Sequence, residues 1–400
     1  MLIIKKLDIW FEKQNFKGWD PYDIKGLDIS LKIQRLGNKS FFGKVIRKLY
    51  FDFTDLFPNI SRKFLNIKPL ENAKGVGLVL TSYSKLYKIT NDKTYLKKAL
   101  KYVDWLEKNR GTKYAGYNWG YPFDWQSAVF IPKGTPSSVV TYTVGNGFYE
   151  LYKATNEKKY LDICIGICEF FTKDLNITYK NNNKICHSYT PLDDYQVHNA
   201  NLFVGEFLVK IGKEINKKEW IDRGIKCANF AISQQQEEGF IPYWGLEQTN
   251  EYSSGNIRND HYHMGFEIRM LYSIWKMIDL EYIKNSWQKY FDFYLNNMFN
   301  NKGIPKLTKD SYYPVNIHSI AESIFCLSTL NEYYRNLDDK IVKIIKFAQE
   351  ELEFKKGEYC YLVKKLSLFG EYKLKIPMYR WGQAWMFLVY VNYMEKIKND

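Results

Sequence analysis

Two histidines and two carboxylates lie within nine residues of one another, in the stretch Asn259–Glu267. Apolar residues follow at helical spacing, so the stretch should form the N-terminal end of a core-facing helix. An unperturbed imidazole titrates near pH 6.5 and can both accept and donate a proton. His261 and His263 are therefore candidates for acid–base chemistry, with Asp260 and Glu267 beside them, although a helix cap uses similar residues. Metal binding by the two histidines is disfavoured, because a spacing of two points their rings to different sides of a helix.

Three further stretches place one polar residue three or four positions before another, which puts both on one helix face. The pairs are His198 with Asn201, His318 with Glu322 and Arg380 with Gln383, in addition to His263 with Glu267. A single buried histidine more often has a structural role. Four such pairs at the ends of converging helices would instead form a polar floor, and this arrangement favours a functional site.

Aromatic side chains accompany the remaining candidate carboxylates. Asp124 lies in an aromatic frame, Asp194 follows Asp193, and Glu247 comes shortly after Trp244. The aromatic candidates are Trp119, Tyr121, Phe123, Trp125, Trp244 and Trp381. Rings next to polar groups suit sugars, whose faces carry apolar C–H groups and whose edges need hydrogen bonds. The alternative is that these rings only pack the loops onto the helices.

The elements that must position these residues are helical hairpins that recur about every sixty residues. Helices rich in small residues are predicted to begin near residues 71, 136, 196, 259, 315 and 379. Lysine-rich amphipathic helices are predicted near 92–109, 156–174, 216–235, 280–298 and 338–353, with residues 1–16 as the sixth. The small-residue helices should form an inner ring and the amphipathic helices an outer one. Asn91, Asn156 and Asn216 are predicted to cap the outer helices at their N-termini.

Long loops precede the inner helices, over residues 114–136, 176–195, 239–258, 303–314 and 357–378. We predict that they form short β-hairpins on one face of the ring, where a pocket would lie. Residues 17–70 are less regular, and we expect short helices broken at Gly37, Gly43 and Pro58. The whole chain, residues 1–400, is predicted to be a single domain.

Six αα-hairpins in a ring resemble the all-α (α/α)6 toroid of the six-hairpin glycosidase-like superfamily. The superfamily includes unsaturated glucuronyl hydrolases, N-acylglucosamine 2-epimerases and polysaccharide lyases. The motifs Asn118–Gln126, Val197–Asn201 and Asn316–Glu322 also resemble those of proteins from surface-polysaccharide gene clusters. The resemblance implies a carbohydrate-active enzyme but not one reaction, since a fold hosts several chemistries.

Two reactions fit these residues. In the first, a base removes a proton from a sugar carbon, as in epimerases and lyases, while another group stabilises the enolate charge. The candidates for base and acid are His198, His261, His263 and His318. Arg380 would hold a carboxylate or an oxyanion, assisted by Asn199 and Asn201.

In the second reaction, an inverting glycoside hydrolase uses two carboxyl groups about 6.5–9.5 Å apart. Asp124 would pair with Asp194 or Asp260, with Glu322 in reserve. We favour the first reaction because of the placement of the histidines. A non-catalytic glycan-binding protein is the further alternative, and it would tolerate loss of each of these histidines.

Composition restricts the class of protein. The chain is 46% hydrophobic and 18% aromatic, a composition that suits a globular fold. Its formal net charge of +14 agrees weakly with an acidic glycan as substrate. No apolar run is long enough to span a membrane, and the N-terminus does not resemble a secretory signal, so we predict a cytoplasmic protein. The six cysteines form no CxxC pair, and neither a metal nor another cofactor is predicted. No nucleic-acid motif is present.

Overall fold

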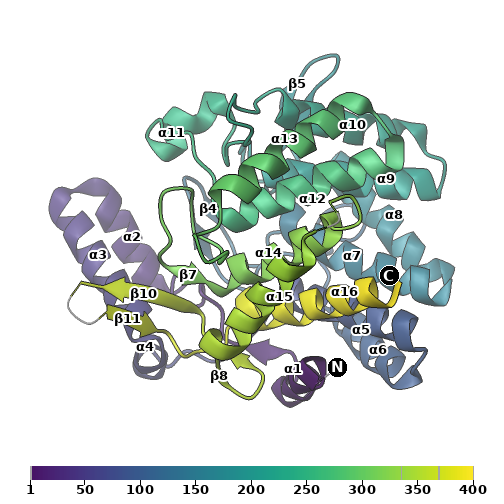
Figure 1. Cartoon of the computed structure of the whole chain (residues 1–400). Helices are drawn as coiled ribbons and strands as arrows, with labels where there is room; N and C mark the ends of the chain where they lie inside the picture. The colour runs from purple at the N-terminus through teal and green to yellow at the C-terminus, as the bar shows by residue number, and fades with distance from the viewer. Residues whose placement is uncertain (1, 335, 368–369, 400) are drawn as a thin grey trace.

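The structure, a computed structural model, describes residues 2–334, 336–367 and 370–399. Within these residues six helices form an inner ring, in which each helix contacts the next and α16 returns to α5 (Figure 1). They are α5 (Ala73–Thr90), α7 (Ser138–Thr155), α9 (His198–Glu214), α12 (His261–Ile278), α14 (Ile317–Leu330) and α16 (Ala384–Asn399), the last preceded by the π-helical turn η3 (Tyr379–Gln383). The predicted (α/α)6 toroid is therefore confirmed.

An outer helix packs against each inner one. The outer helices are α6 (Lys93–Lys108), α8 (Lys158–Lys173), α10 (Lys218–Ile232), α13 (Glu281–Asn297), α15 (Asp338–Phe347) with the π-helical turn η2 (Ala348–Leu352), and α1 (Leu2–Gln14), which packs on α16. The inner helices cross closely where they carry glycine. At Gly77 in α5, an added Cβ would lie 2.9 Å from the Cα of Val144 in α7, so a larger residue would force the two helices apart.

The asparagines between paired helices end the first helix rather than begin the second. Asn91 and Asn156 adopt left-handed conformations, with φ of 56° and 58°, at the C-caps of α5 and α7. Asn216 has the same conformation, with φ of 57°. Asparagine tolerates this conformation better than most residues, so it closes a helix where the chain turns sharply. The predicted N-cap role is wrong, and in α6 the neighbouring Asp92 performs it by accepting a hydrogen bond from the Thr94 N–H.

Short antiparallel strands occur in three of the five predicted loops. They are β3 (Trp125–Gln126) with β4 (Phe130–Ile131), β5 (Ile177–Lys180) with β6 (Ile185–His187), and β10 (Leu362–Leu366) with β11 (Gly370–Lys373) and β7 (Val315–Asn316). Two further pairs are β1 (Lys17–Gly18) with β2 (Leu70–Glu71) and β8 (Glu353–Lys355) with β9 (Glu358–Tyr359). The loop 239–258 instead contains η1 (Leu246–Gln248) and α11 (Thr249–Ser253), so the predicted hairpin is wrong there. Its Glu and Gln residues favour a helical turn over a strand.

Residues 24–68 form a separate projection, here named the N-terminal lobe, at the left of Figure 1. It contains α2 (Asp28–Lys39), α3 (Phe41–Leu56) and α4 (Pro58–Phe64). The predicted breaks at Gly37 and Gly43 are wrong, since both glycines lie inside helices. The chain breaks at Ser40 instead, whose side chain caps α3, and before Pro58, which begins α4. None of the described helices is both long and apolar enough to cross a lipid bilayer.

Candidate active site

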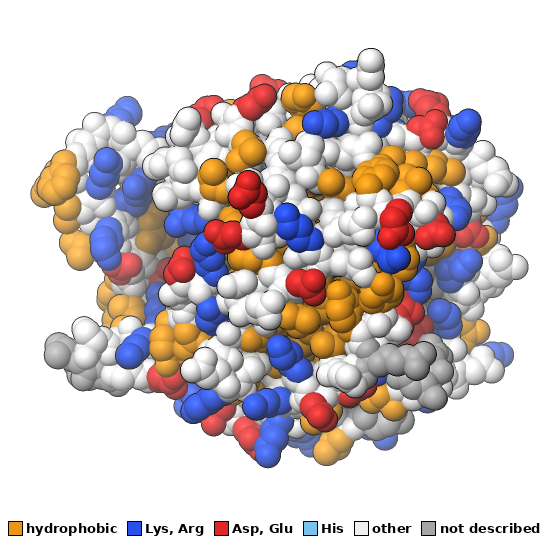
Figure 2. Space-filling model, turned by 45° about the horizontal axis from the view of Figure 1, so that its top comes forward, with side chains coloured by type: hydrophobic (Ala, Val, Ile, Leu, Met, Phe, Trp, Pro, Cys, Tyr) orange, Lys and Arg blue, Asp and Glu red, His pale blue; other side chains and the backbone are white. Residues whose placement is uncertain are grey.

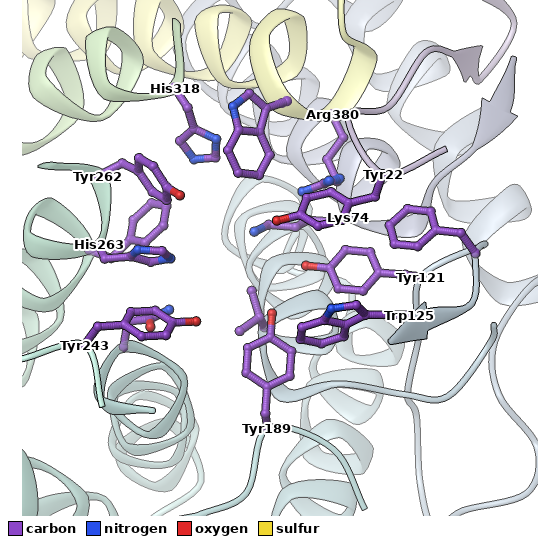
Figure 3. A pocket seen from close by; sticks show the side chains of 15 residues that line it. Tyr22, Lys74, Tyr121, Trp125, Tyr189, Tyr243, Tyr262, His263, His318 and Arg380 are labelled. Atoms are coloured by element: carbon purple, nitrogen blue, oxygen red, sulfur yellow. The ribbon is translucent and has the colours of Figure 1, made fainter. Parts of the chain in front are cut away.

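A cavity of about 110 Å³ lies at the N-terminal ends of the inner helices. Its lining comes from all six of these helices or the turns before them, and from the loops that precede them (Figure 3). The lining residues are Tyr22, Lys74, Tyr121, Phe123, Trp125, Val139, Tyr189, Asn199, Tyr243, Tyr262, His263, Phe266, His318, Arg380 and Trp381. The inner-helix ends and the loops therefore gather around one pocket, as predicted.

Two imidazoles face this cavity, one from α12 and one from α14 (Figure 3). His318 is 1% exposed, and neither of its ring nitrogens has a hydrogen-bond partner among the described residues. Burial, followed by the charges of Lys74 and Arg380, holds the pKa of His318 well below its ordinary value. The ring is therefore neutral at pH 7 and has a lone pair available to accept a proton.

His263 is held by the residue that caps its own helix. Asp260 is the N-cap of α12, and its Oδ1 accepts the His263 backbone N–H at 3.1 Å. Its Oδ2 lies 2.8 Å from Nδ1 of the His263 ring. Because an ionised carboxylate can only accept a hydrogen bond, the proton resides on Nδ1 and Nε2 is left for a substrate. The cap therefore also orients the imidazole and fixes its tautomer.

Lys74 brings an amine into the same cavity from the first turn of α5. It is buried, and its ammonium makes no ion pair or hydrogen bond within the described part of the chain. Its Nζ lies 6.0 Å from the ring centroid of Phe266 and 5.8 Å from that of Trp385. Burial and then the charge of Arg380 lower the pKa of Lys74 to about 7. The amine thus exchanges a proton in the range where enzymes work.

Arg380 also lines the cavity, but its charge is already paired. Its Nε and one terminal nitrogen donate to Asp20 at 2.6 and 2.8 Å, and both side chains are almost fully buried. The guanidinium lies 5.2 Å from the ring centroids of both Tyr121 and Trp381. A bidentate pair of this kind fixes the side chain firmly. Lys74 is therefore the less compensated cation of the two.

Tyrosines form much of the remaining wall, and Figure 3 shows their rings around the open space. Burial raises the pKa of Tyr121, Tyr189, Tyr243 and Tyr262 above the ordinary phenol value. These hydroxyls therefore stay protonated and can both donate and accept hydrogen bonds. Asn199 adds a buried side-chain oxygen, Oδ1, without a hydrogen-bond partner among the described residues. The wall is thus lined with neutral hydrogen-bonding groups on aromatic surfaces, an arrangement that suits a polyhydroxylated molecule.

An apolar layer of Phe203, Phe266 and Trp385 closes the cavity at its inner end. The ring centroid of Phe266 lies 5.4 Å from that of Phe203 and 5.4 Å from that of Trp385. On the far side a second cavity of about 230 Å³ is lined by residues nearer the other ends of the inner helices. The buried ion pair of Arg269 and Glu322 lies beside this layer, with Nε–Oε1 at 2.6 Å. The two cavities are therefore separate.

A groove of about 460 Å³ adjoins the first cavity. Tyr243, Tyr262 and His263 belong to both, so the imidazole lies where they meet. The groove also contains Trp244, Arg258, Asp260 and the short helix α11. A sugar in the cavity could therefore extend along an aromatic surface outside it.

The other two candidate histidines are buried elsewhere and already have partners. The Nε2 of His198 lies 3.0 Å from Oε1 of Gln234. The Nε2 of His261 lies 2.7 Å from Ser323 Oγ and 2.6 Å from the Tyr294 hydroxyl. Neither lines the cavity, so the structure brings together only His263 and His318 of the four.

The candidate carboxylates also lie outside the cavity, and no Asp or Glu among the described residues lines it. Glu322 pairs with Arg269, while Glu267 accepts from the Tyr290 hydroxyl at 2.5 Å. Asp124 accepts the Lys133 N–H at 2.7 Å, and Asp194 is exposed on its loop. Asp260 reaches the cavity only through His263.

Some of the remaining predicted binding residues line the cavity or the groove, and others lie outside both. Asn199, Trp125, Arg380 and Trp381 line the cavity, and Trp244 lines the groove. Three others are buried and hydrogen-bonded to the backbone: Trp119, Asn201 and Gln383. The Nε1 of Trp119 donates to the Leu106 carbonyl. The side chain of Asn201 binds the backbone of Ile185, His187 and Cys227, and that of Gln383 binds the backbone of Gly357 and Tyr359. These three fix loops to helices.

Several lining residues were not found from the sequence. They are Tyr22, Lys74, Val139, Tyr189, Tyr243, Tyr262 and Phe266. A signal existed for Lys74, because a lysine in the first turn of an otherwise apolar inner helix opposes the helix dipole and the burial around it. Tyr22, Tyr189 and Tyr243 come from loops and Tyr262 from the first turn of α12. In none of these places does the sequence show whether a tyrosine faces a cavity or packs against its neighbours. No group of three or more His, Cys, Asp or Glu side chains within the described ranges is placed to hold a metal ion.

No protein-family profile matches the sequence, and no curated protein matches it. Solved structures do match. Cellobiose 2-epimerase from Bacillus thermoamylovorans has a TM-score of 0.63 and 11% identity, covering 80% of this chain and 87% of that one. A D-mannose isomerase has a TM-score of 0.61 and 12% identity, covering 82% and 88%. The GH76 α-mannanase of Bacteroides thetaiotaomicron has a TM-score of 0.58 and 14% identity, covering 82% and 88%. These likenesses show that the chain shares the (α/α)6 toroid fold of these solved structures.

Proposed function

We propose that this protein is a carbohydrate-active enzyme that moves a proton on a sugar carbon next to a carbonyl group, as an epimerase, isomerase or lyase does. The observation that carries the proposal is the presence of two imidazoles, and no carboxylate from the described residues, on the wall of one cavity. The similar solved structures include an epimerase and an isomerase of sugars, which supports the same class. The sequence resemblance further suggests a role in surface-polysaccharide metabolism.

The neutral imidazole of His318 is the proposed base. Its pKa is low first because the ring is buried, and then because Lys74 and Arg380 oppose a third positive charge. When the substrate gains negative charge as its proton leaves, that charge offsets the two cations and makes His318 a stronger base. His263, oriented by Asp260, is the second proton carrier, which can return a proton to the carbon or act on a hydroxyl group.

Lys74 is the proposed stabiliser of the oxygen that becomes negative. An ammonium that is buried and unpaired costs free energy until an anion lies beside it, so its interaction is strongest in the transition state. The tyrosines and Asn199 would hold the sugar hydroxyls, and Trp125 and Trp381 would contact its apolar face.

Inverting hydrolysis has less support. It needs an acid and a base on opposite sides of the scissile bond. Asp124, Asp194 and Glu322 do not line the cavity, and Asp260 lies behind His263. A solved hydrolase among the similar structures keeps this reaction as the second candidate.

The test is to incubate the protein in deuterated water with a panel of reducing sugars and uronate-containing oligosaccharides. Proton transfer predicts solvent deuterium at the carbon next to the carbonyl, or a new unsaturated product, detected by NMR and mass spectrometry. A new reducing end without deuterium would overturn the proposal in favour of hydrolysis. Sugar binding without turnover, unchanged when His318 is replaced by Gln, would indicate a non-catalytic glycan-binding protein.

A further inference from the structure

For its length, the N-terminal lobe exposes far more large apolar side chains than the rest of the described chain. Ten of the 22 exposed large apolar side chains in the described residues belong to residues 24–68. Phe41, Phe42 and Phe64 are 82%, 73% and 87% exposed. Exposed phenylalanines in such number usually mark a surface that another molecule covers.

On α3 these side chains form a stripe, named here the α3 stripe and made of Phe42, Val45, Leu49 and Phe53. Spacings of three and four residues place the four side chains on one face of the helix. All four are exposed, whereas the buried residues of α3, Gly43 and Thr54, lie outside the stripe. The stripe is therefore not the surface by which α3 packs on its own chain.

Positive charge accompanies this apolar surface. Residues 24–68 contain ten lysines and arginines and only three aspartates. About a ninth of the chain therefore carries half of its net charge of +14. Lys44 and Lys48 are exposed on α3 outside the stripe, and Lys48 is paired with Asp52. On the lobe at the left of Figure 2, orange apolar and blue basic side chains lie among one another. An anionic surface that also accepts apolar side chains would satisfy both properties.

We propose that the N-terminal lobe docks on an anionic lipid surface, with the α3 stripe inserted among the acyl chains and the lysines against the headgroups. Helices with large apolar residues on one side and basic residues beside them bind membranes in this way. A second copy of the chain is a poorer occupant, because it would bring two equally positive lobes together.

The lobe is fixed beside the cavity, so docking would also orient the enzyme. Arg62 donates to Asp23 at 2.7 Å and to the Asp20 carbonyl at 3.0 Å, and Asp20 in turn holds Arg380. Arg35 on α2 donates to Gln126 at 3.2 Å, next to Trp125 of the cavity wall. These contacts tie the lobe to the face of the ring on which the cavity lies.

The experiment is sedimentation of the full chain with vesicles of phosphatidylcholine, with and without phosphatidylglycerol. We expect binding to the anionic vesicles that weakens as the salt concentration rises, and little binding to the neutral ones. Phe42→Ser/Leu49→Ser should weaken binding by about tenfold per side chain. Lys44→Glu/Lys48→Glu should weaken binding to the anionic vesicles alone. The matched control, Ile177→Ser/Leu192→Ser, replaces two exposed apolar residues outside the lobe and should bind normally.

Near-UV circular dichroism would check that each variant is folded, and the charge-reversal variant decides the matter if the serine variant is not. Absence of binding by the wild-type chain overturns the proposal, as does equal binding by the wild-type and both lobe variants. Dimerisation in sedimentation velocity without lipid, abolished by Phe42→Ser/Leu49→Ser, would assign the surface to a second copy instead.

Discussion

His261 and His263 are two residues apart on α12, yet their surroundings differ completely. His261 is fully buried between helices, where Ser323 and Tyr294 satisfy its Nε2. His263 is partly exposed at the junction of the cavity and the groove, and among the described residues only Asp260 is hydrogen-bonded to its ring. Burial lowers the pKa of His261 to about 3, so this ring stays neutral and does not titrate near pH 7.

The difference shows that side-chain direction, not residue type, separates a structural from a chemical histidine. Residues two positions apart on a helix differ by about 200° around its axis. One imidazole therefore points to the neighbouring helix, and the other points to the central axis of the toroid. The same division separates His198, which is bound to Gln234, from His318, which has no partner among the described residues. Substitutions of the cavity histidines should therefore lower activity, and substitutions of the buried histidines should lower stability.

The largest expected effect is on activity at the cavity histidines. His318→Gln and His263→Gln should each lower kcat/KM by about 10²–10⁴, because each removes a proton carrier. The free energy of unfolding should change little, because His318 has no hydrogen-bond partner among the described residues and the partner of His263, Asp260, is partly exposed. Deuterium exchange into substrate and urea unfolding measure the two quantities. Full turnover in His318→Gln would refute its role as the base.

Lys74→Met should lower kcat/KM by about 10²–10³, the usual cost of removing a group that stabilises an oxyanion. It should also stabilise the fold. The unfolded chain keeps the Lys74 proton up to the ordinary pKa of lysine, whereas the folded chain loses it at a pKa of about 7. The protonated amine therefore destabilises the fold at and below pH 7. The free energy of unfolding rises again as the pH rises above 7.

The same pKa predicts a pH profile. Activity of the wild-type should fall above about pH 7 as Lys74 loses its proton, whereas Lys74→Arg stays charged and should keep any residual activity at higher pH. Measurements of kcat/KM from pH 5 to 9 test this. Identical alkaline limbs for the two proteins would contradict the assignment.

His261→Ala should behave in the opposite way to His318→Gln. Loss of the ring leaves the buried Tyr294 hydroxyl without that partner and opens a cavity, at a cost of about 1–3 kcal/mol of stability. Activity per folded molecule should stay close to that of the wild-type. Urea unfolding with parallel activity assays distinguishes this result from a catalytic role, in which activity would fall without loss of stability.

The smallest effect is expected for Asp260→Asn, with kcat/KM lowered by about tenfold. Asparagine caps helices as well as aspartate, so α12 should remain intact while the charge that orients His263 is lost. Unfolding measurements should show no more than about 1 kcal/mol of change. An activity loss as large as that of His263→Gln would contradict this modest effect and would mean that the carboxylate is as necessary as the imidazole.

The toroid and the location of the site were predictable because both follow from local patterns. The repeat of about sixty residues fixed the number and order of the helices, and the polar first turns marked the face that carries the cavity. The pairing of Asp20 with Arg380 was not predictable, since it joins the two ends of the chain through a loop without periodicity. Nor could the sequence show which aromatic rings face the cavity. The prediction of one domain, and the roles of the site residues, stay predictions.

The apolar layer of Phe203, Phe266 and Trp385 separates the site from the cavity on its far side. A polymer would therefore not thread through the ring along its axis, and a substrate of the proposed reaction would reach His318 from the face that carries the loops. Product must also leave by the route through which the next substrate arrives. If the proposed reaction is right, we expect competitive inhibition by product.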